Sequence, residues 1–246
     1  MSNYPFPAEM PDLMYPGVKP VGKIKGDREN PLTNGLLLSM PLQMQHTSTV
    51  LVPELASGYN FRLYNNETLP LPDGVECAIT ESSIVKTMPD SEYGNMFTND
   101  FTMTFLWKNL ITTSKYRFMA HHTAYTSFSM SYESDGRDAW FTGQKISGGS
   151  DTSVILDGKV HLMMYVYTSN GTIRLYIDGI YSGTATKAVT GLTGTFSING
   201  RSDLAQRQSG GILHAFNMFD YAIKEENVGN ISRELTSNPY GLYIPA

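Results

Sequence analysis

The clearest pattern of apolar and polar positions in this chain lies between residues 156 and 186. Apolar side chains recur at every second position over 160–167 and again over 172–178, and such a period places alternate residues on opposite faces of a β-strand. Asn170-Gly171 and Asp178-Gly179 accept the positive φ angles of tight turns. The stretch is therefore predicted to be a three-stranded antiparallel meander. In the first strand, one alternating set should face the core and the other the outside, and the two sets are Val160, Leu162, Met164 and Val166 against His161, Met163, Tyr165 and Tyr167.

The same alternation predicts further strands along the chain. The strongest covers residues 100–108, where Phe101, Met103, Phe105 and Trp107 share one face. The others are predicted at 36–42, 74–79, 83–86, 117–121, 127–132, 140–142, 196–201 and 212–218. We expect the glycine- and serine-rich segment 143–151 to be a loop.

The two ends of the chain differ from this body. An apolar stripe at Val228, Ile231 and Leu235 predicts one helix over 224–235. Five prolines within residues 1–30 exclude a helix or a central strand there. That segment is predicted to be an extended docking arm, with a flexible leader as the alternative, and its candidate contact residues are Tyr4, Phe6, Met10, Leu13, Met14 and Tyr15. We expect a body over 31–235 and an extended tail over 236–246.

Composition narrows the class of protein. The 246 residues contain no Ser/Gly-rich linker, so we expect one domain with terminal arms. The net charge is −5 without any Lys/Arg run, which argues against a nucleic-acid partner. No apolar run approaches the ~20 residues of a membrane span, so no membrane partner is expected. The single cysteine excludes an intrachain disulfide.

The central segment IRLYIDGIYSGTAT resembles the laminin-G-like, concanavalin A-type jelly rolls. The later segments FSINGR and GGI, with a strand ending at Phe219, extend that resemblance over about residues 31–235. It implies an all-β antiparallel sandwich of the concanavalin A-like jelly-roll type with one short C-terminal helix. Such folds carry lectins, hydrolases and structural modules, so the fold leaves the function open.

The entry NPLTNGLL and the ending NPYGLYIP resemble proteins of this kind encoded by tailed bacteriophages. The resemblance implies a non-enzymatic structural virion protein, such as a capsid decoration or head-surface protein assembled in the bacterial cytoplasm. Its partners would be the major capsid or other virion proteins and further copies of itself, attached through the arms. The host, the oligomeric state and the position in the particle stay open.

Two alternatives compete with that role. A carbohydrate-binding module for host glycans would use an aromatic platform with polar neighbours, and the candidates are Tyr132, Asp135, Arg137, Asp138 and Trp140. In the competing interpretation Trp140 packs in the core and the acids decorate a turn. A diverged glycoside hydrolase would need two carboxylates roughly 5 to 9 Å apart. The Glu-x-Asp-x-x-Glu run typical of hydrolases with this fold is missing, so we expect no enzyme activity and no catalytic residues.

Metal ions are not expected either. The segment PELASGYNFRLYN resembles one that follows the entry strand in the family and implies calcium there, but Glu54 stands where Asp is usual. Asp135 and Asp138 alone do not specify a calcium site, which needs several converging oxygens. His121 and His122 are adjacent in a predicted strand and point to opposite faces. We therefore predict no cofactor, with calcium implied only by the resemblance.

Overall fold

The computed structural model describes most of the body of the chain. Backbone and side chains are described at 29–40, 97, 99–110, 119–121, 128–133, 138–149, 151–189, 196–198, 211–237 and 242. Further strands are described in their backbone only. The predicted arm residues between Tyr4 and Tyr15 lie outside the described residues, as do Asp135 and Arg137.

The described elements are strands, two 3₁₀ turns and one α-helix. The predicted strands and the helix are confirmed within a few residues at each end. The strands are β1 (Ile24–Gly26), β2 (Leu36–Met40), β3 (Leu51–Pro53), β4 (Asn60–Tyr64), β5 (Thr68–Leu71), β6 (Gly74–Cys77), β7 (Ser83–Met88), β8 (Phe101–Asn109), β9 (Tyr116–His122), β10 (Ser129–Glu133), β11 (Ala139–Phe141), β12 (Gln144–Gly148), β13 (Val160–Thr168), β14 (Thr172–Ile177), β15 (Ile180–Thr186), β16 (Gly194–Ile198), β17 (Gly211–Phe219) and β18 (Tyr243–Pro245). The helices are η2 (Pro31–Thr33), η3 (Thr152–Leu156) and α2 (Glu225–Ser237).

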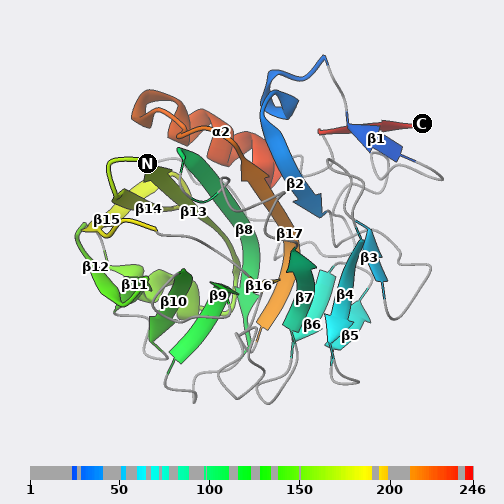
Figure 1. The fold of residues 1–246 in the computed structure, drawn as a ribbon, viewed down its shortest axis with the longest axis horizontal. Helices are drawn as coiled ribbons and strands as arrows, with labels where there is room; N and C mark the ends of the chain where they lie inside the picture. The colour runs from blue at the N-terminus through cyan, green and yellow to red at the C-terminus, as the bar shows by residue number, and fades with distance from the viewer. Residues whose placement is uncertain are drawn as a thin grey trace.

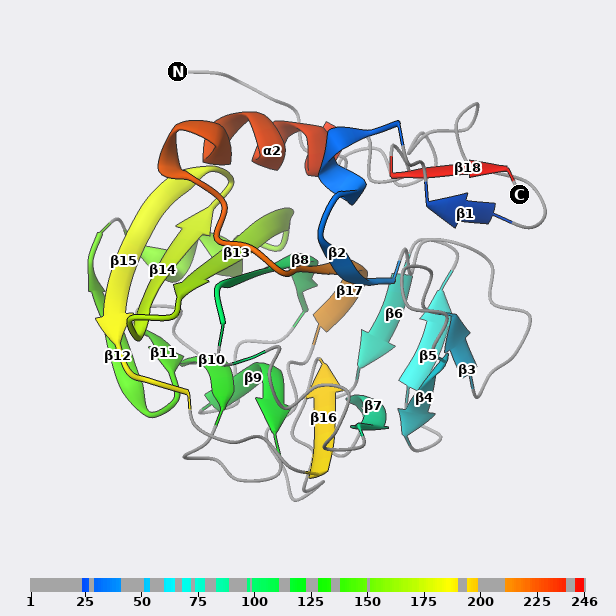
Figure 2. The ribbon, with the colours of Figure 1, turned by 45° about the horizontal axis from the view of Figure 1, so that its top comes forward.

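Sixteen strands form one antiparallel sheet that curls back on itself. The order is β3-β4-β7-β16-β9-β10-β11-β12-β15-β14-β13-β8-β17-β6-β5, with β2 also paired to β17. The strands from β3 to β12 form one layer, here called the lower sheet, and those from β15 to β5 form the upper sheet. Helix α2 covers the upper sheet on the side away from the lower one (Figures 1 and 2). The predicted antiparallel β-sandwich with one C-terminal helix is confirmed.

Glycines occupy the seam where the lower sheet turns into the upper one. β12 pairs with β15 only through Ser147 with Thr184 and Gly148 with Gly183. Gly148 and Gly183 have φ angles of +87° and +138°, which L side chains rarely adopt. A Cβ atom at Gly149 would collide with the carbonyl group of Ser182. The prediction of a loop over 143–151 was wrong, because these glycines continue a strand around a sharp bend.

The predicted meander is confirmed, but both faces of β13 are buried, whereas one face was expected to lie outside. β13 pairs with β14, and β14 pairs with β15, through the two expected Gly turns. The odd-numbered residues Met163, Tyr165 and Tyr167 point into the core between the two sheets. The even-numbered residues of β13, among them Leu162 and Met164, are also buried, in a second core beneath α2. The expected outer face was wrong because a helix covers it.

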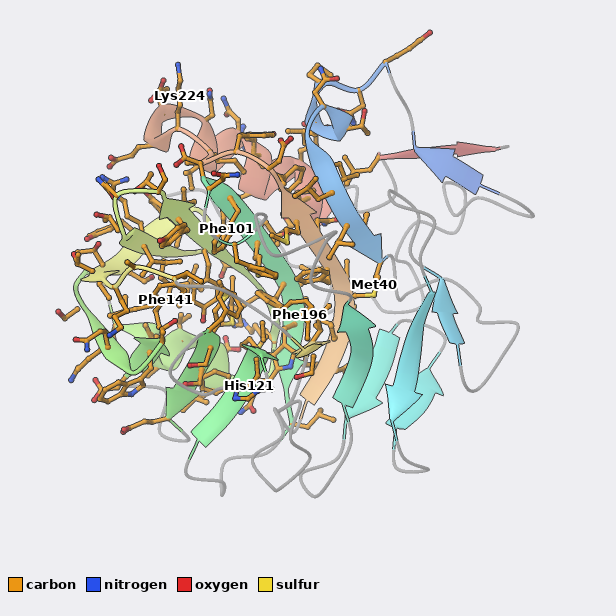
Figure 3. All side chains as sticks on the ribbon, viewed as in Figure 1. Met40, Phe101, His121, Phe141, Phe196 and Lys224 are labelled. Atoms are coloured by element: carbon orange, nitrogen blue, oxygen red, sulfur yellow. The ribbon has the colours of Figure 1, made fainter. Side chains whose placement is uncertain are left out.

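The core between the sheets is rich in aromatic rings. The Phe101 ring stacks on the Tyr167 ring with centroids 4.8 Å apart, and the Phe128 ring meets the Phe141 ring edge to face at 6.0 Å. Figure 3 shows Phe101 entering this core from the upper sheet and Phe141 and Phe196 from the lower sheet. Edge-to-face and offset pairs of this kind add to the stability gained by apolar burial.

Helix α2 packs closely on the turn between β14 and β15. Val228, Ser232 and Leu235 are its buried residues. A Cβ atom at Gly179 in that turn would lie 3.3 Å from the Cα atom of Gly229 and 3.4 Å from the Cβ atom of Ser232. Small residues on both sides therefore let the helix approach the sheet.

Strands from the two ends of the chain pair with each other. β1 and β18 form a separate two-stranded antiparallel sheet in which Ile24 lies opposite Pro245 and Gly26 opposite Tyr243 (Figure 1). β1 falls in the predicted arm 1–30, and β18 falls in the predicted tail 236–246. The limits proposed for the arms stay a prediction.

Candidate functional site

Three short strands of the lower sheet carry the predicted surface site. β10, β11 and β12 form two consecutive hairpins. Met130, Tyr132, Ala139, Phe141 and Ile146 point into the core between the sheets. Since neighbouring strand residues point to opposite faces, Ser131, Trp140 and Lys145 lie on the outer face.

Trp140 is at the centre of this outer face. It lies directly opposite Ser131 on β10 and opposite Lys145 on β12. The indole is half-buried, and its Nε1–H has no hydrogen-bond partner among the described residues. Ser147, which shares this face of β12 with Lys145, is exposed. An aromatic side chain therefore lies in a largely polar surface.

Two acids and one base border the indole. Lys145 Nζ lies 2.5 Å from Asp138 Oδ1. The backbone N–H of Glu133 donates to the carbonyl oxygen of Asp138 at 2.8 Å. The two acidic residues are therefore cross-strand neighbours and project from the same face as Trp140. We call Glu133, Asp138, Trp140 and Lys145 the Trp140 surface, while Ser131, on the same face, is buried.

A strained hairpin turn holds β11 against β12. Phe141 pairs with Gln144, so the connection consists of Thr142 and Gly143 with φ angles of +48° and +76°. Two positive φ angles are typical of a type I′ turn, in which a β-branched residue is strained. The N–H of Thr142 donates to the carbonyl oxygen of Ser129 at 2.8 Å. This bond ties the turn to β10.

Of the five predicted binding residues, the structure places Asp138 and Trp140 on this surface. Tyr132 does not belong there, and this part of the prediction was wrong. Its side chain is fully buried and meets the Trp107 ring edge to face, with centroids 5.3 Å apart. Tyr132 follows Ser131 directly in the strand, so the alternation of faces turns it into the core. The sequence-based prediction did not include Glu133 and Lys145, although the alternation of faces along paired strands could have placed both beside Trp140.

His161 forms a second cluster of titratable groups with two aspartates. Its Nδ1 atom lies 2.7 Å from Asp178 Oδ2, and its Nε2 atom lies 2.8 Å from Asp157 Oδ1. Burial acts to lower the pKa of His161, but the hydrogen bonds and charges of Asp178 and then Asp157 outweigh it and raise the pKa. His161 is only 4% exposed, and both ring nitrogens are occupied. The cluster therefore fits a structural role.

The described residues do not fit a metal site. They contain no group of three or more His, Cys, Asp or Glu side chains arranged to hold an ion. Asp138, a candidate calcium ligand, directs one oxygen to Lys145. Within the described part of the chain, no helix has both the length and the hydrophobicity that a membrane crossing needs.

The arrangement of strands matches known folds. Residues 81–229 match the family model of the concanavalin A-like lectin/glucanases superfamily. No curated protein matches the chain. Trypanosoma rangeli sialidase in complex with sialic acid is similar at a TM-score of 0.64 and 10% identity, over 95% of this chain and 37% of the sialidase.

Botulinum neurotoxin structures are also similar. The binding domain of neurotoxin DC in complex with rat synaptotagmin II matches at a TM-score of 0.60 and 15% identity, over 82% of this chain and 52% of that chain. A neurotoxin type C structure, described with two ganglioside molecules in cell entry, matches at a TM-score of 0.59 and 15% identity, with the same coverage. The chain thus spans between about a third and about half of these structures.

At such identities the likeness concerns the fold alone. The family model covers more than half of the sequence, including the curled sheet that carries Trp140. The chain therefore belongs to the concanavalin A-like lectin/glucanases superfamily.

Proposed function

We propose that this protein is a non-enzymatic carbohydrate-binding module whose ligand surface is the Trp140 surface. The observation that carries the proposal is the half-buried indole on the outer face, between Ser131 and Lys145 and beside the Asp138–Lys145 ion pair. The family and the glycan-related fold neighbours support this function at the level of the fold only.

The geometry suits a sugar ring for a physical reason. One face of a pyranose carries C–H groups and is apolar, while its rim carries hydroxyl groups. An indole offers a large, rigid apolar face at a small entropic cost. Carboxylates accept hydrogen bonds from hydroxyls, and an ammonium group or a serine donates to them. Trp140 supplies the platform, and Glu133, Asp138 and Lys145 supply the rim contacts.

A role in a bacteriophage virion stays a prediction. It depends on arm residues between Tyr4 and Tyr15, which lie outside the described residues. The entry and tail segments that suggested it are a resemblance in sequence only. Capsid partners and self-association stay predictions for the same reason.

A diverged hydrolase is the second candidate, and one observation favours it. Glu133 and Asp138 are opposed carboxylates on neighbouring strands beside Trp140, which is a feature that glycoside hydrolysis requires. We nevertheless propose binding without turnover, because Asp138 already directs an oxygen to Lys145. Incubation of the protein with the glycans that it binds should release no shorter sugars. If wild type releases shorter sugars and Glu133→Gln does not, the hydrolase is favoured.

A glycan array with the full-length protein tests the proposal. Wild type should bind a defined set of glycans, and Trp140→Ala should weaken that binding about thirtyfold, since loss of a central aromatic contact costs about 2 kcal/mol or more. Ile180→Ala is the control. Ile180 is an exposed apolar residue, at 62%, and it follows the Gly179 turn that packs against helix α2. Equal binding by wild type and Trp140→Ala would overturn the site.

A further inference from the structure

We infer that the Trp140 surface selects neutral glycans and discriminates against glycans that carry a carboxylate. The inference rests on the proposed function and adds the chemical class of the ligand. The charges that the lower sheet places around the indole set this preference.

Three charged side chains border Trp140 in the part of the lower sheet whose side chains the structure describes. Among the described residues of β10, β11, β12 and their turns, the side chains charged at neutral pH are Glu133, Asp138 and Lys145. Two carboxylates and one ammonium group leave one net negative charge. Asp135 and Arg137, which lie between β10 and β11 in the sequence, have opposite formal charges that cancel in this sum.

The one described cation at the surface is already paired. Lys145 Nζ lies 2.5 Å from Asp138 Oδ1, although half of the lysine side chain is exposed. A ligand carboxylate could pair with Lys145 only by competing with Asp138. It would also approach Glu133, which has the same charge. Like charges brought together at a binding surface reduce affinity and exclude wrong partners.

A neutral sugar meets no such conflict. Its hydroxyl groups can donate to Glu133 and Asp138 and accept from Lys145 without breaking the ion pair. A neutral polar group is also present on this face, because Ser147 is exposed on β12. The net charge of −5 on the whole chain adds long-range repulsion of anions. The local and the overall charge therefore favour the same ligand class.

The experiment compares pairs of glycans that differ only by a terminal sialic acid. Wild type should bind the neutral member at least about tenfold more tightly, a difference that corresponds to about 1.4 kcal/mol. Glu133→Gln should reduce the ratio of the two affinities at least about threefold by improving binding of the sialylated member. Glu226→Gln is the matched control, because it removes the same charge from an exposed position on α2. That variant should leave the ratio of the two affinities unchanged.

The outcomes separate the inference from the proposed function. Preference for sialylated glycans that is lost in Trp140→Ala would overturn the inference and leave the binding surface in place. If Glu133→Gln and Glu226→Gln reduced the ratio of the two affinities equally, the inference would also be overturned, because only the overall charge would then matter. If no glycan of either class binds, the proposed function fails and the inference fails with it.

Discussion

Asp178 Oδ2 lies 2.7 Å from His161 Nδ1, and this contact joins the β14–β15 turn to the start of β13. The other oxygen of Asp178 accepts the N–H of Leu162 at 2.9 Å. On its far side the imidazole meets Asp157, which in turn accepts the N–H of Lys159 at 2.7 Å. A buried imidazole therefore connects the end of η3, a central strand and a turn that supports helix α2.

This cluster predicts a pH dependence of stability. The pKa of folded His161 is raised above the unfolded value of about 6.5. The stabilisation from protonated His161 is thus complete below about pH 6.5 and is lost as the pH rises through the folded pKa. His161→Asn removes the charge. Urea denaturation should show that wild type exceeds this variant in free energy of unfolding at about pH 6 and that the difference shrinks by about pH 9. A difference that grows with pH would contradict the prediction.

Two tyrosines on the same face of β13 should respond oppositely to loss of their hydroxyl groups. The Tyr165 hydroxyl is buried and has no hydrogen-bond partner within the described ranges, and burial raises its pKa. The Tyr167 hydroxyl accepts the N–H of Val189 at 3.2 Å. Tyr165→Phe should therefore raise the free energy of unfolding by about 1 kcal/mol, and Tyr167→Phe should lower it by about 1 kcal/mol. Urea denaturation of both variants at one pH measures this, and equal losses would contradict it.

The contact between Gly179 and Gly229 predicts a second contrasting pair. A Cβ atom at Gly229 would have open space around it, and Gly229 lies inside helix α2. Gly229→Ala should stabilise the fold by about 0.5 to 1 kcal/mol, because alanine loses less conformational entropy in a helix. Gly179 has a φ of +80° and faces the helix at 3.3 Å. Gly179→Ala should therefore lower the melting temperature while Gly229→Ala raises it. A lower melting temperature for both variants would show that the contact between the Gly179 turn and helix α2 also requires Gly229.

Local pattern was enough to predict most of the sandwich. Strand positions follow from alternation, and the hairpins follow from Asn170-Gly171 and Asp178-Gly179, because these signals act within a few residues. Which face of β13 is inside could not be read in this way. Both faces are apolar, and the helix that covers one of them lies about sixty residues further along the chain.

The candidate site was predictable in part. Strand alternation alone separates Tyr132 from Trp140, since Trp140 pairs with Ser131. Predicting the Asp138–Lys145 ion pair would have required the pairing register of β11 and β12, which depends on the two-residue turn at Thr142 and Gly143. The contact between His161 and Asp178 joins residues from two strands, and no local spacing marks it.

The Thr142-Gly143 turn offers a test of how the Trp140 surface is held. Thr142 has a φ of +48°, where a β-branched residue is unfavourable and asparagine is well tolerated. Thr142→Asn should raise the free energy of unfolding by about 0.5 to 1 kcal/mol, because it relieves strain in the left-handed region. The bond from the Thr142 N–H to Ser129 is a backbone bond and should persist in the variant. Glycan affinity should then stay within about twofold of wild type, since Trp140 keeps its register. Denaturation and titration with a bound glycan measure the two effects. A loss of stability would mean that the Thr142 Oγ1 atom, 3.4 Å from the Ser129 nitrogen, stabilises the turn more than its strain costs.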